Sequence, residues 1–258
     1  MAMLEIKDMT MRFGGLVAVD KLNLEVKEGE LVSLIGPNGA GKTTVFNVLT
    51  GLYPSAEGNI SFGGENITGK SPQQVVRAGI ARTFQNLRLF PNMRVIENVL
   101  LGNHIETKYN FLDLLFRTKK FKMAEQQATQ AAIDVLDSIG LADKVDRYAS
   151  SLPYGEQRRL EIARAIATGA KLLLLDEPAA GMNPAETEEL MAFIRMLRDK
   201  GFTILMIEHD MNLVMNISDR IYVLDFGKLI ATGLPEQIAE NPKVIEAYLG
   251  GGDFDVED

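Results

Sequence analysis

The chain has no cysteine, which excludes disulfides and thiolate metal sites. It has only two histidines, His104 and His209, so we do not expect a histidine-rich metal site, and His104 lies in no motif and is interpreted as structural. No apolar run approaches the ~18–20 residues that a membrane-spanning helix needs, and Met1–Thr10 has no signal-peptide pattern. A net charge of −8 argues against a nucleic-acid groove. We expect a cytoplasmic protein that reaches a membrane only by docking to another protein.

Length and composition favour one large folded unit. The 258 residues are 46% hydrophobic and 24% charged, which suits one α/β domain, with or without a subdomain. The apolar runs Leu172–Leu175 and Thr203–Ile207 are typical of buried strands, and a helical pattern over Ala185–Lys200 separates them. This alternation predicts a largely parallel sheet.

The beginning and the middle of the chain follow other patterns. Leu4–Lys7 and Leu22–Val26 alternate apolar and polar residues, which predicts strands of an N-terminal antiparallel β subdomain. Helical patterns dominate the middle, including Met123–Ile139 and Glu156–Ala167. The expected division is an α/β core with the β subdomain at 1–92 and 168–249, an inserted helical subdomain at 93–167, and a disordered acidic tail at 250–258.

A glycine-rich segment, Gly36–Thr44, has the context of a phosphate-binding loop. It follows the apolar run Leu31–Ile35 and precedes the helical pattern Val45–Leu49. Its glycines let successive backbone N–H groups surround an anion, and the helix that follows directs its positive dipole end at the same anion. The context of strand, glycine-rich turn and helix favours a P-loop ATPase core over the structural alternative, a glycine turn between two core elements. The segment therefore predicts binding of a nucleoside triphosphate.

Individual residues of this loop have distinct expected roles. Lys42 would place a point charge at the β and γ phosphates and would also serve catalysis, and Thr43 would bind Mg²⁺ through its hydroxyl. The residues expected to bind ATP here are Gly36, Asn38, Gly39, Ala40, Gly41, Lys42, Thr43 and Thr44.

Two adjacent carboxylates end the predicted strand Leu172–Leu175. Asp176 at this position can bind Mg²⁺ directly or through water, and Glu177, one residue further, can polarise an attacking water. The structural alternative is a strand that ends in a solvated acidic turn. Beside a phosphate-binding loop, we favour the metal and catalytic roles.

These motifs, in this order, resemble those of an ABC-type ATPase over nearly the whole chain, from Leu4 to about Leu249. The segments that carry the resemblance are Gly36–Thr44, Gln85, Leu152–Gln157, Asp176–Glu177 and His209. Other segments resemble, more narrowly, the ATP-binding subunits of branched-chain amino-acid importers. These are Met11–Gly15, Arg82–Gln85, Pro178–Gly181 and Ile207–Met211.

The resemblance implies roles for three further residues. Phe13 would stack on adenine, Gln85 would sense Mg²⁺ and the attacking water, and His209 would hydrogen-bond the γ-phosphate. The structural alternatives are a core phenylalanine, a solvated glutamine and a capping histidine. Glu177, His209, Gln85 and Lys42 form the expected catalytic set, and Thr43, Gln85 and Asp176 the expected metal set.

The segment Leu152–Gln157 departs from the usual Leu-Ser-Gly-Gly-Gln of the family. Leu152 and Gly155 match, whereas Pro153, Tyr154 and Glu156 do not. Proline offers a γ-phosphate neither a hydroxyl nor an N–H, so anion binding would depend on Gly155, its neighbouring amides and the helix dipole. A glutamate here suits a phosphate site only if it points away.

The resemblance also implies partners. In the family, this segment of one subunit closes the ATP site of another, so Gly155 would act in trans in a homodimer or a heterodimer. The chain would hydrolyse ATP with Mg²⁺ and drive hydrophobic permease subunits, fed by a solute-binding protein, at the inner face of the cell membrane. Branched-chain or related hydrophobic amino acids would be the solutes.

Two other functions are compatible with a phosphate-binding loop. An ABC-type ATPase acting on nucleic acid or the ribosome would usually carry coiled-coil insertions or two ATPase units, and this chain has one unit, no heptad run and an acidic balance. A small-molecule kinase would leave Gln85 and His209 without a role. Residues 111–122, apolar and then basic, are either a packed helix with a solvated end or a contact for a membrane partner.

Overall fold

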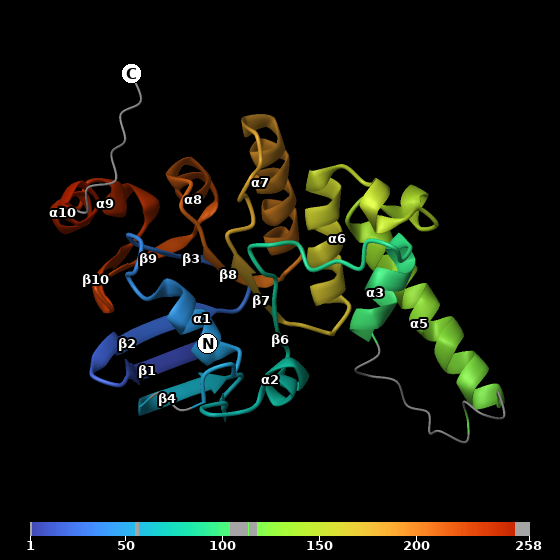
Figure 1. Ribbon diagram of the computed structural model, residues 1–258, viewed down its shortest axis with the longest axis horizontal. Helices are drawn as coiled ribbons and strands as arrows, with labels where there is room; N and C mark the ends of the chain where they lie inside the picture. Colours follow the sequence, from blue (N-terminus) through green and yellow to red (C-terminus); the bar gives the residue numbers. More distant parts are fainter. Residues whose placement is uncertain (1, 55–56, 104–112, 114–117, 251–258) are drawn as a thin grey trace.

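The computed structural model describes residues 2–54, 57–103, 113 and 118–250. His104, residues 251–258, and residues 111–112 and 114–117 of the segment 111–122 lie outside the described residues. The chain forms one four-stranded and one six-stranded sheet with helices around them (Figure 1). The expected α/β fold, with a mostly parallel sheet and an antiparallel N-terminal sheet, is confirmed.

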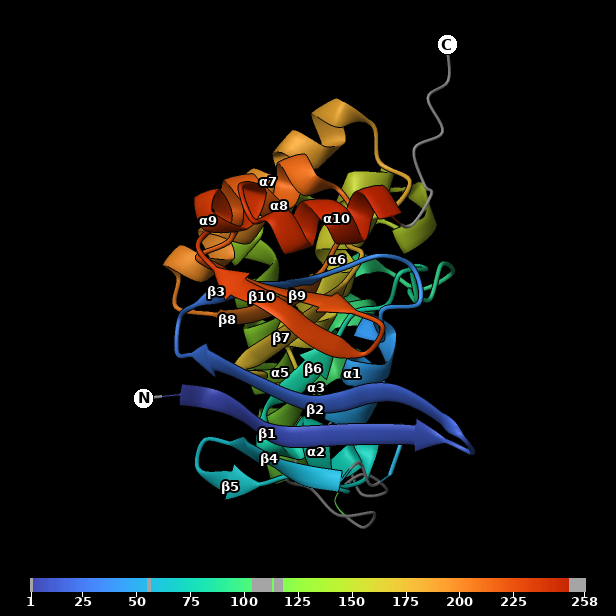
Figure 2. The same ribbon diagram turned by 90° about the vertical axis from the view of Figure 1, so that its left-hand side faces the viewer.

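The four-stranded sheet is antiparallel, in the order β2-β1-β4-β5, and lies at the lower side of the molecule in Figure 2. Its strands are β1 (Ala2–Phe13), β2 (Leu16–Lys27), β4 (Glu57–Phe62) and β5 (Glu65–Asn66). β1 extends well beyond the predicted Leu4–Lys7, so Phe13 is the last residue of a strand and stands at the tip of the β1–β2 hairpin.

The six-stranded sheet has the order β10-β9-β3-β8-β7-β6 and is parallel except for the antiparallel edge pair β9–β10. Its strands are β3 (Leu31–Ile35), β6 (Ile80–Arg82), β7 (Leu172–Asp176), β8 (Thr203–Ile207), β9 (Arg220–Asp225) and β10 (Lys228–Gly233). Leu34 and Asp176 both pair with Ile207, so the carboxyl ends of β3, β8 and β7 lie side by side. The loops after these three strands therefore meet at one edge of the sheet.

The two faces of the parallel sheet belong to two hydrophobic cores. In β7, Leu172 and Leu174 pack with Phe46 of α1 (Lys42–Leu49) and with the antiparallel sheet. Leu173 and Leu175 point the other way, into a core shared with the helices on that side. All four leucines are fully buried, as the continuous apolar run of a central parallel strand predicts.

The other helices outside the middle segment begin with recognisable sequence signals. Pro72, Pro184, Pro235 and Pro242 each open a helix, a position that tolerates a missing N–H. Asn183 caps α7 by accepting a hydrogen bond from the backbone N–H of Glu186 at 3.0 Å. These helices are α2 (Pro72–Ala78), α7 (Pro184–Asp199), α8 (Met211–Ile217), α9 (Pro235–Ala239) and α10 (Pro242–Gly250).

The described chain between β6 and β7 is helical, and its helices gather at one end of the molecule, at the right in Figure 1. They are α3 (Val95–Asn103), α5 (Lys119–Ser138), α6 (Tyr154–Ile166) and the short 3₁₀ turns Ala142–Lys144 and Ala149–Ser151. α5 and α6 confirm the helices predicted from the apolar patterns. None of the helices in the described ranges is long and apolar enough to cross a bilayer.

Gly102 allows α3 to pack closely on α6. A Cβ at this position would stand 2.3 Å from the backbone oxygen of Arg164 and 3.2 Å from the Cβ of Ala167. We expect Gly102→Ala to lower the free energy of unfolding by about 1–3 kcal/mol, because overpacking exceeds the gain in helix propensity. Urea unfolding measures this. Gly15→Ala is the matched control, since a Cβ there meets nothing within 4 Å, and equal effects of the two substitutions would contradict the packing argument.

Candidate functional site

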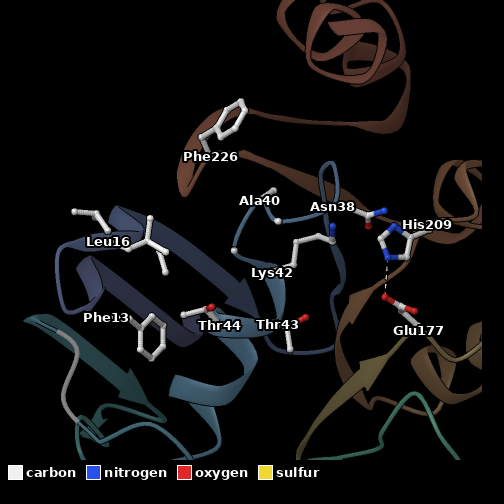
Figure 3. A pocket seen from close by; sticks show the side chains of 14 residues that line it. Phe13, Leu16, Asn38, Ala40, Lys42, Thr43, Thr44, Glu177, His209 and Phe226 are labelled. Atoms are coloured by element: carbon white, nitrogen blue, oxygen red, sulfur yellow. Dashed lines mark hydrogen bonds and ion pairs between the residues drawn. The ribbon is translucent and has the colours of Figure 1, made fainter. Parts of the chain in front are cut away.

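A cavity of about 510 Å³ opens where the phosphate-loop segment meets the carboxyl ends of β7 and β8. Figure 3 shows that the side chains around it come from the β1–β2 hairpin, from the loop before α1 and the start of α1, from the turn between β9 and β10, and from the ends of β7 and β8. Its lining residues are Phe13, Leu16, Val17, Ala18, Asn38, Gly39, Ala40, Gly41, Lys42, Thr43, Thr44, Glu177, His209 and Phe226. The structure thus brings most of the predicted site residues together.

The loop before α1 requires glycine at two positions. Gly36 has φ 150°, and a Cβ on it would lie 2.0 Å from the backbone oxygen of Leu224. Gly41 has φ 102°, and its Cβ would lie 2.6 Å from the backbone oxygen of Ala18. Gly41 precedes α1 and no side chain caps this helix, so the first backbone N–H groups of α1 are available to an anion.

Lys42 is buried at the first position of α1. Its Nζ donates to the backbone oxygens of Gly36, at 2.6 Å, and Pro37, at 2.9 Å. Burial lowers the pKa of the Lys42 ammonium, and the charge of Glu177 partly opposes this shift. An anion in the cavity would compensate the buried positive charge, which is the electrostatic condition for a phosphate site.

Glu177 contacts two of the other predicted catalytic side chains, Gln85 and His209. The Nε2 of His209 is 2.6 Å from Glu177 Oε1 (Figure 3), and the Nε2 of Gln85 donates to Glu177 Oε2 at 2.5 Å. Glu177 has a left-handed backbone, φ 47°, and its N–H donates to the backbone oxygen of Ile207. Strained backbone at such a position is common in functional sites. The residues Ile80–Phe84 predict a strand that ends at Gln85, whereas β6 ends at Arg82 and Gln85 lies in a bend three residues further on.

Asp176 is buried at the end of β7 and forms an ion pair with Arg82, from Nη2 to Oδ2 at 2.6 Å. The described residues contain no cluster of three His, Cys, Asp or Glu side chains that could hold a metal alone. Mg²⁺ usually takes only one or two carboxylates, with substrate phosphates and water completing its octahedron. The carboxylate of Asp176, the hydroxyl of Thr43 and the amide of Gln85 are oxygen donors of this kind, so the residues present fit Mg²⁺ bound together with a nucleotide.

Phe13 lies beside the cavity, with 41% of its surface exposed. Its ring packs edge-on against Tyr53, with 5.1 Å between the centroids and 77° between the planes. The core alternative for Phe13 therefore does not describe this side chain. Leu16 and Phe226 line the same cavity and are also exposed, which leaves apolar surface available to a base.

The segment Leu152–Gln157 is not among the residues that line the cavity. Pro153 precedes the first turn of α6, and Tyr154 donates its hydroxyl proton to the backbone oxygen of Ala180 at 2.9 Å. Glu156 forms an ion pair with Lys144, which balances its negative charge. A Cβ on Gly155 would meet nothing within 4 Å, so the start of α6 is an open surface.

Four further residues contact the site or its loops and were given no role from the sequence. Glu208, which is buried, accepts the backbone N–H groups of Ala179 and His209, and burial raises its pKa. Tyr248 of α10 packs on the core that contains Ile35. Burial raises the pKa of Tyr248 to about 12, and a hydrogen bond with the backbone of Gly36 opposes part of this rise.

Two arginines complete this set of residues. Arg82 donates a hydrogen bond to Asp176, and Arg158 donates to the backbone oxygens of Phe84 and Gln85. Arg82 belongs to the segment Arg82–Gln85, which carries part of the family resemblance, whereas no pattern in the sequence indicated a role for Tyr248.

Fold and site together define a nucleotide-binding protein of the phosphate-loop class. The family model "ABC transporter" matches residues 19–180, and the model "Branched-chain amino acid ATP-binding cassette transporter" matches residues 228–253. The chain belongs to the ABC transporter ATP-binding family, on the branch of branched-chain amino-acid transport.

Relatives and solved structures agree with this assignment. The chain is 52% identical over 248 residues to the high-affinity branched-chain amino acid transport ATP-binding protein BraF of Pseudomonas aeruginosa, covering 96% of this chain and 97% of that protein. It is 52% identical to LivG of Escherichia coli K12, covering 96% and 98%. The ADP conformation of MJ1267, an ATP-binding cassette of an ABC transporter, superposes with a TM-score of 0.84 at 34% identity, covering 97% and 99%.

Proposed function

We propose that this chain is the ATP-hydrolysing, energy-coupling subunit of an ABC importer for branched-chain or related hydrophobic amino acids. The observation that carries the proposal is the position of Glu177, held by Gln85 and His209 beside the phosphate-loop cavity. A carboxylate so placed is a general base for water that attacks a γ-phosphate. The names printed for BraF and LivG support the solute class.

The positions of the binding residues support their proposed roles. Lys42 and the amides of Gly36–Thr44 bind the phosphates, and Phe13 supplies an exposed ring for adenine. Thr43, Asp176 and Gln85 would hold Mg²⁺, which would neutralise charge on the β and γ phosphates.

Hydrolysis requires a water that is oriented and deprotonated. Glu177 accepts the proton from this water, and Gln85 and His209 fix both carboxylate oxygens in place. His209 lines the cavity and, once ATP is bound, can direct its ring toward the γ-phosphate.

A second ATP-binding subunit, identical or related, completes the site. Leu152–Gln157 stands outside the cavity of its own chain with Gly155 open, which supports an action in trans. ATP closes the dimer and hydrolysis reopens it. The helices of residues 93–167, as an inserted subdomain, transmit this motion to permease subunits that receive solute from a binding protein, at the inner face of the membrane.

Extraction of the native assembly with detergent tests the function. We expect two hydrophobic permease subunits to co-purify with this chain, and Mg²⁺-dependent ATPase activity to rise when a solute-binding protein loaded with leucine, isoleucine or valine is added. Recovery of nucleic acid in place of permease subunits would favour the alternative of an ATPase acting on nucleic acid or the ribosome. The comparisons with known proteins give that alternative no support.

A further inference from the structure

Arg82 is bonded to each of the segments that carry the proposed Mg²⁺ ligands. Its Nη2 donates to Asp176 Oδ2 at 2.6 Å, and its Nη1 donates to Asn47 Oδ1 at 2.7 Å. Asn47 lies four residues after Thr43 in α1, so both residues share one face of that helix. Arg82 itself ends β6, three residues before Gln85. One guanidinium therefore connects the phosphate-loop helix, the end of β7 and the loop of Gln85.

The position of this guanidinium is closely determined. The side chains of Arg82 and Asp176 are only 6% and 10% exposed. The guanidinium carbon lies 5.5 Å from the ring centroid of Phe46 in α1 and 4.9 Å from that of Phe84 in the loop before Gln85. A planar cation between two rings, bonded to a carboxylate and to an amide, has little freedom to move. Low exposure also strengthens each of these interactions.

We propose that Arg82 is a positioning residue for metal-dependent ATP binding, an inference that rests on the proposed Mg²⁺ site. Arg82 holds Asp176 through one carboxylate oxygen and leaves the other for the cation or its water. It also fixes α1 and the Gln85 loop relative to that oxygen. Groups that orient a metal ligand matter nearly as much as the ligand, and Mg²⁺ demands near-ideal octahedral geometry whereas Ca²⁺ accepts irregular geometry.

The test measures ATP affinity by calorimetry with and without Mg²⁺, which separates metal binding from catalysis. We expect Arg82→Met to reduce the Mg²⁺-dependent gain in ATP affinity by about 10–100-fold and to leave the metal-free affinity unchanged. The Ca²⁺-dependent gain should fall less, a difference that a general loss of structure would not produce. Arg82→Lys retains a charge for Asp176 and should restore part of the Mg²⁺-dependent gain.

Two further variants keep the test decisive. Asn47→Ala removes the hydrogen bond between Arg82 and α1 and leaves the ion pair between Arg82 and Asp176. This variant therefore reports on positioning even if Arg82→Met folds poorly. We expect it to lose part of the Mg²⁺-dependent gain in ATP affinity. Arg220→Met is the matched control, because Arg220 pairs with Glu25 and Glu30 and lies over the Tyr222 ring at the other end of the sheet. It should leave the gain unchanged.

The outcomes separate this inference from the function on which it rests. A Mg²⁺-dependent gain that persists in both Arg82→Met and Asn47→Ala overturns the positioning role alone. A wild-type chain whose ATP affinity does not respond to Mg²⁺ overturns the metal part of the proposed function, and this inference with it.

Discussion

Glu177→Gln is expected to lower kcat for ATP hydrolysis by about 10²–10⁴-fold, the range that general base catalysis contributes. The expected change in KM is small, because Lys42 and the loop amides bind the phosphates, whereas the Glu177 carboxylate contacts Gln85 and His209 and is proposed to act on the water. Among the substitutions considered, this one should have the largest effect on turnover.

Glutamine is suited to this test because it preserves the shape of the site. A side-chain amide at position 177 can still accept the proton of the Gln85 amide and can donate to the His209 ring when Nε2 of that ring is unprotonated. The substitution therefore removes the basicity of the carboxylate while both neighbours keep a partner. A fall in kcat then reports on proton transfer.

Single-turnover phosphate release and steady-state kinetics measure the effect. Glu189→Gln is the control, because Glu189 is an exposed residue of α7 whose carboxylate pairs only with Arg159 in the described structure. It should hydrolyse ATP at the wild-type rate. A loss of less than about threefold in Glu177→Gln would assign the general base to another group.

The same variant should accumulate as a dimer when ATP is present, because ATP would bridge Gly36–Thr44 of one subunit and Leu152–Gln157 of the other without being consumed. Light scattering after size exclusion, with and without ATP, gives the mass directly. If Glu177→Gln remains monomeric at every ATP concentration, a composite site between two copies of this chain is wrong. A native heterodimer would then require the related subunit to be added.

Much of the site could be predicted from the sequence because its chemistry lies in short local segments. A glycine-rich loop between a strand and a helix, and carboxylates directly after a buried strand, have few other structural explanations. Since β3, β7 and β8 are parallel neighbours, their carboxyl ends necessarily meet, and Lys42, Glu177 and His209 come to line one cavity.

The contacts between distant segments could not be predicted in this way. Arg82 and Asp176 are 94 residues apart, and their ion pair depends on the register of β6 on β7 and on the rotamers of both side chains. Tyr248 reaches Gly36 only because α10 packs against the end of β3. The predicted end of the strand Ile80–Phe84 was also wrong, because Thr83 and Phe84 are of residue types that suit a strand yet lie in the loop between β6 and the bend at Gln85.

Lys42→Met should weaken ATP binding by about 10²–10³-fold, which corresponds to about 3–4 kcal/mol and to the loss of one member of a buried charge pair. Lys42 is buried, lines the cavity and donates to the backbone oxygens of Gly36 and Pro37. Burial lowers the pKa of its ammonium, because a buried positive charge is unfavourable without a neighbouring anion. A bound phosphate supplies that anion and stabilises the lysine ammonium, whereas a methionine has no charge to pair with the phosphate.

The nucleotide-free protein should be little affected by the same substitution. Methionine removes two hydrogen bonds but also removes a buried charge, and these effects on the free energy of unfolding oppose each other. Calorimetric titration with ATP measures the loss of binding, and thermal unfolding of the nucleotide-free protein measures any loss of stability. Lys7→Met is the control, because Lys7 belongs to an exposed ion pair.

Lys42→Arg should not rescue binding, because a planar guanidinium does not fit where Nζ lies 2.6 Å from the Gly36 oxygen. Full ATP affinity in Lys42→Arg would show that any cation at this position suffices, and that the compact lysine ammonium is not what the loop requires.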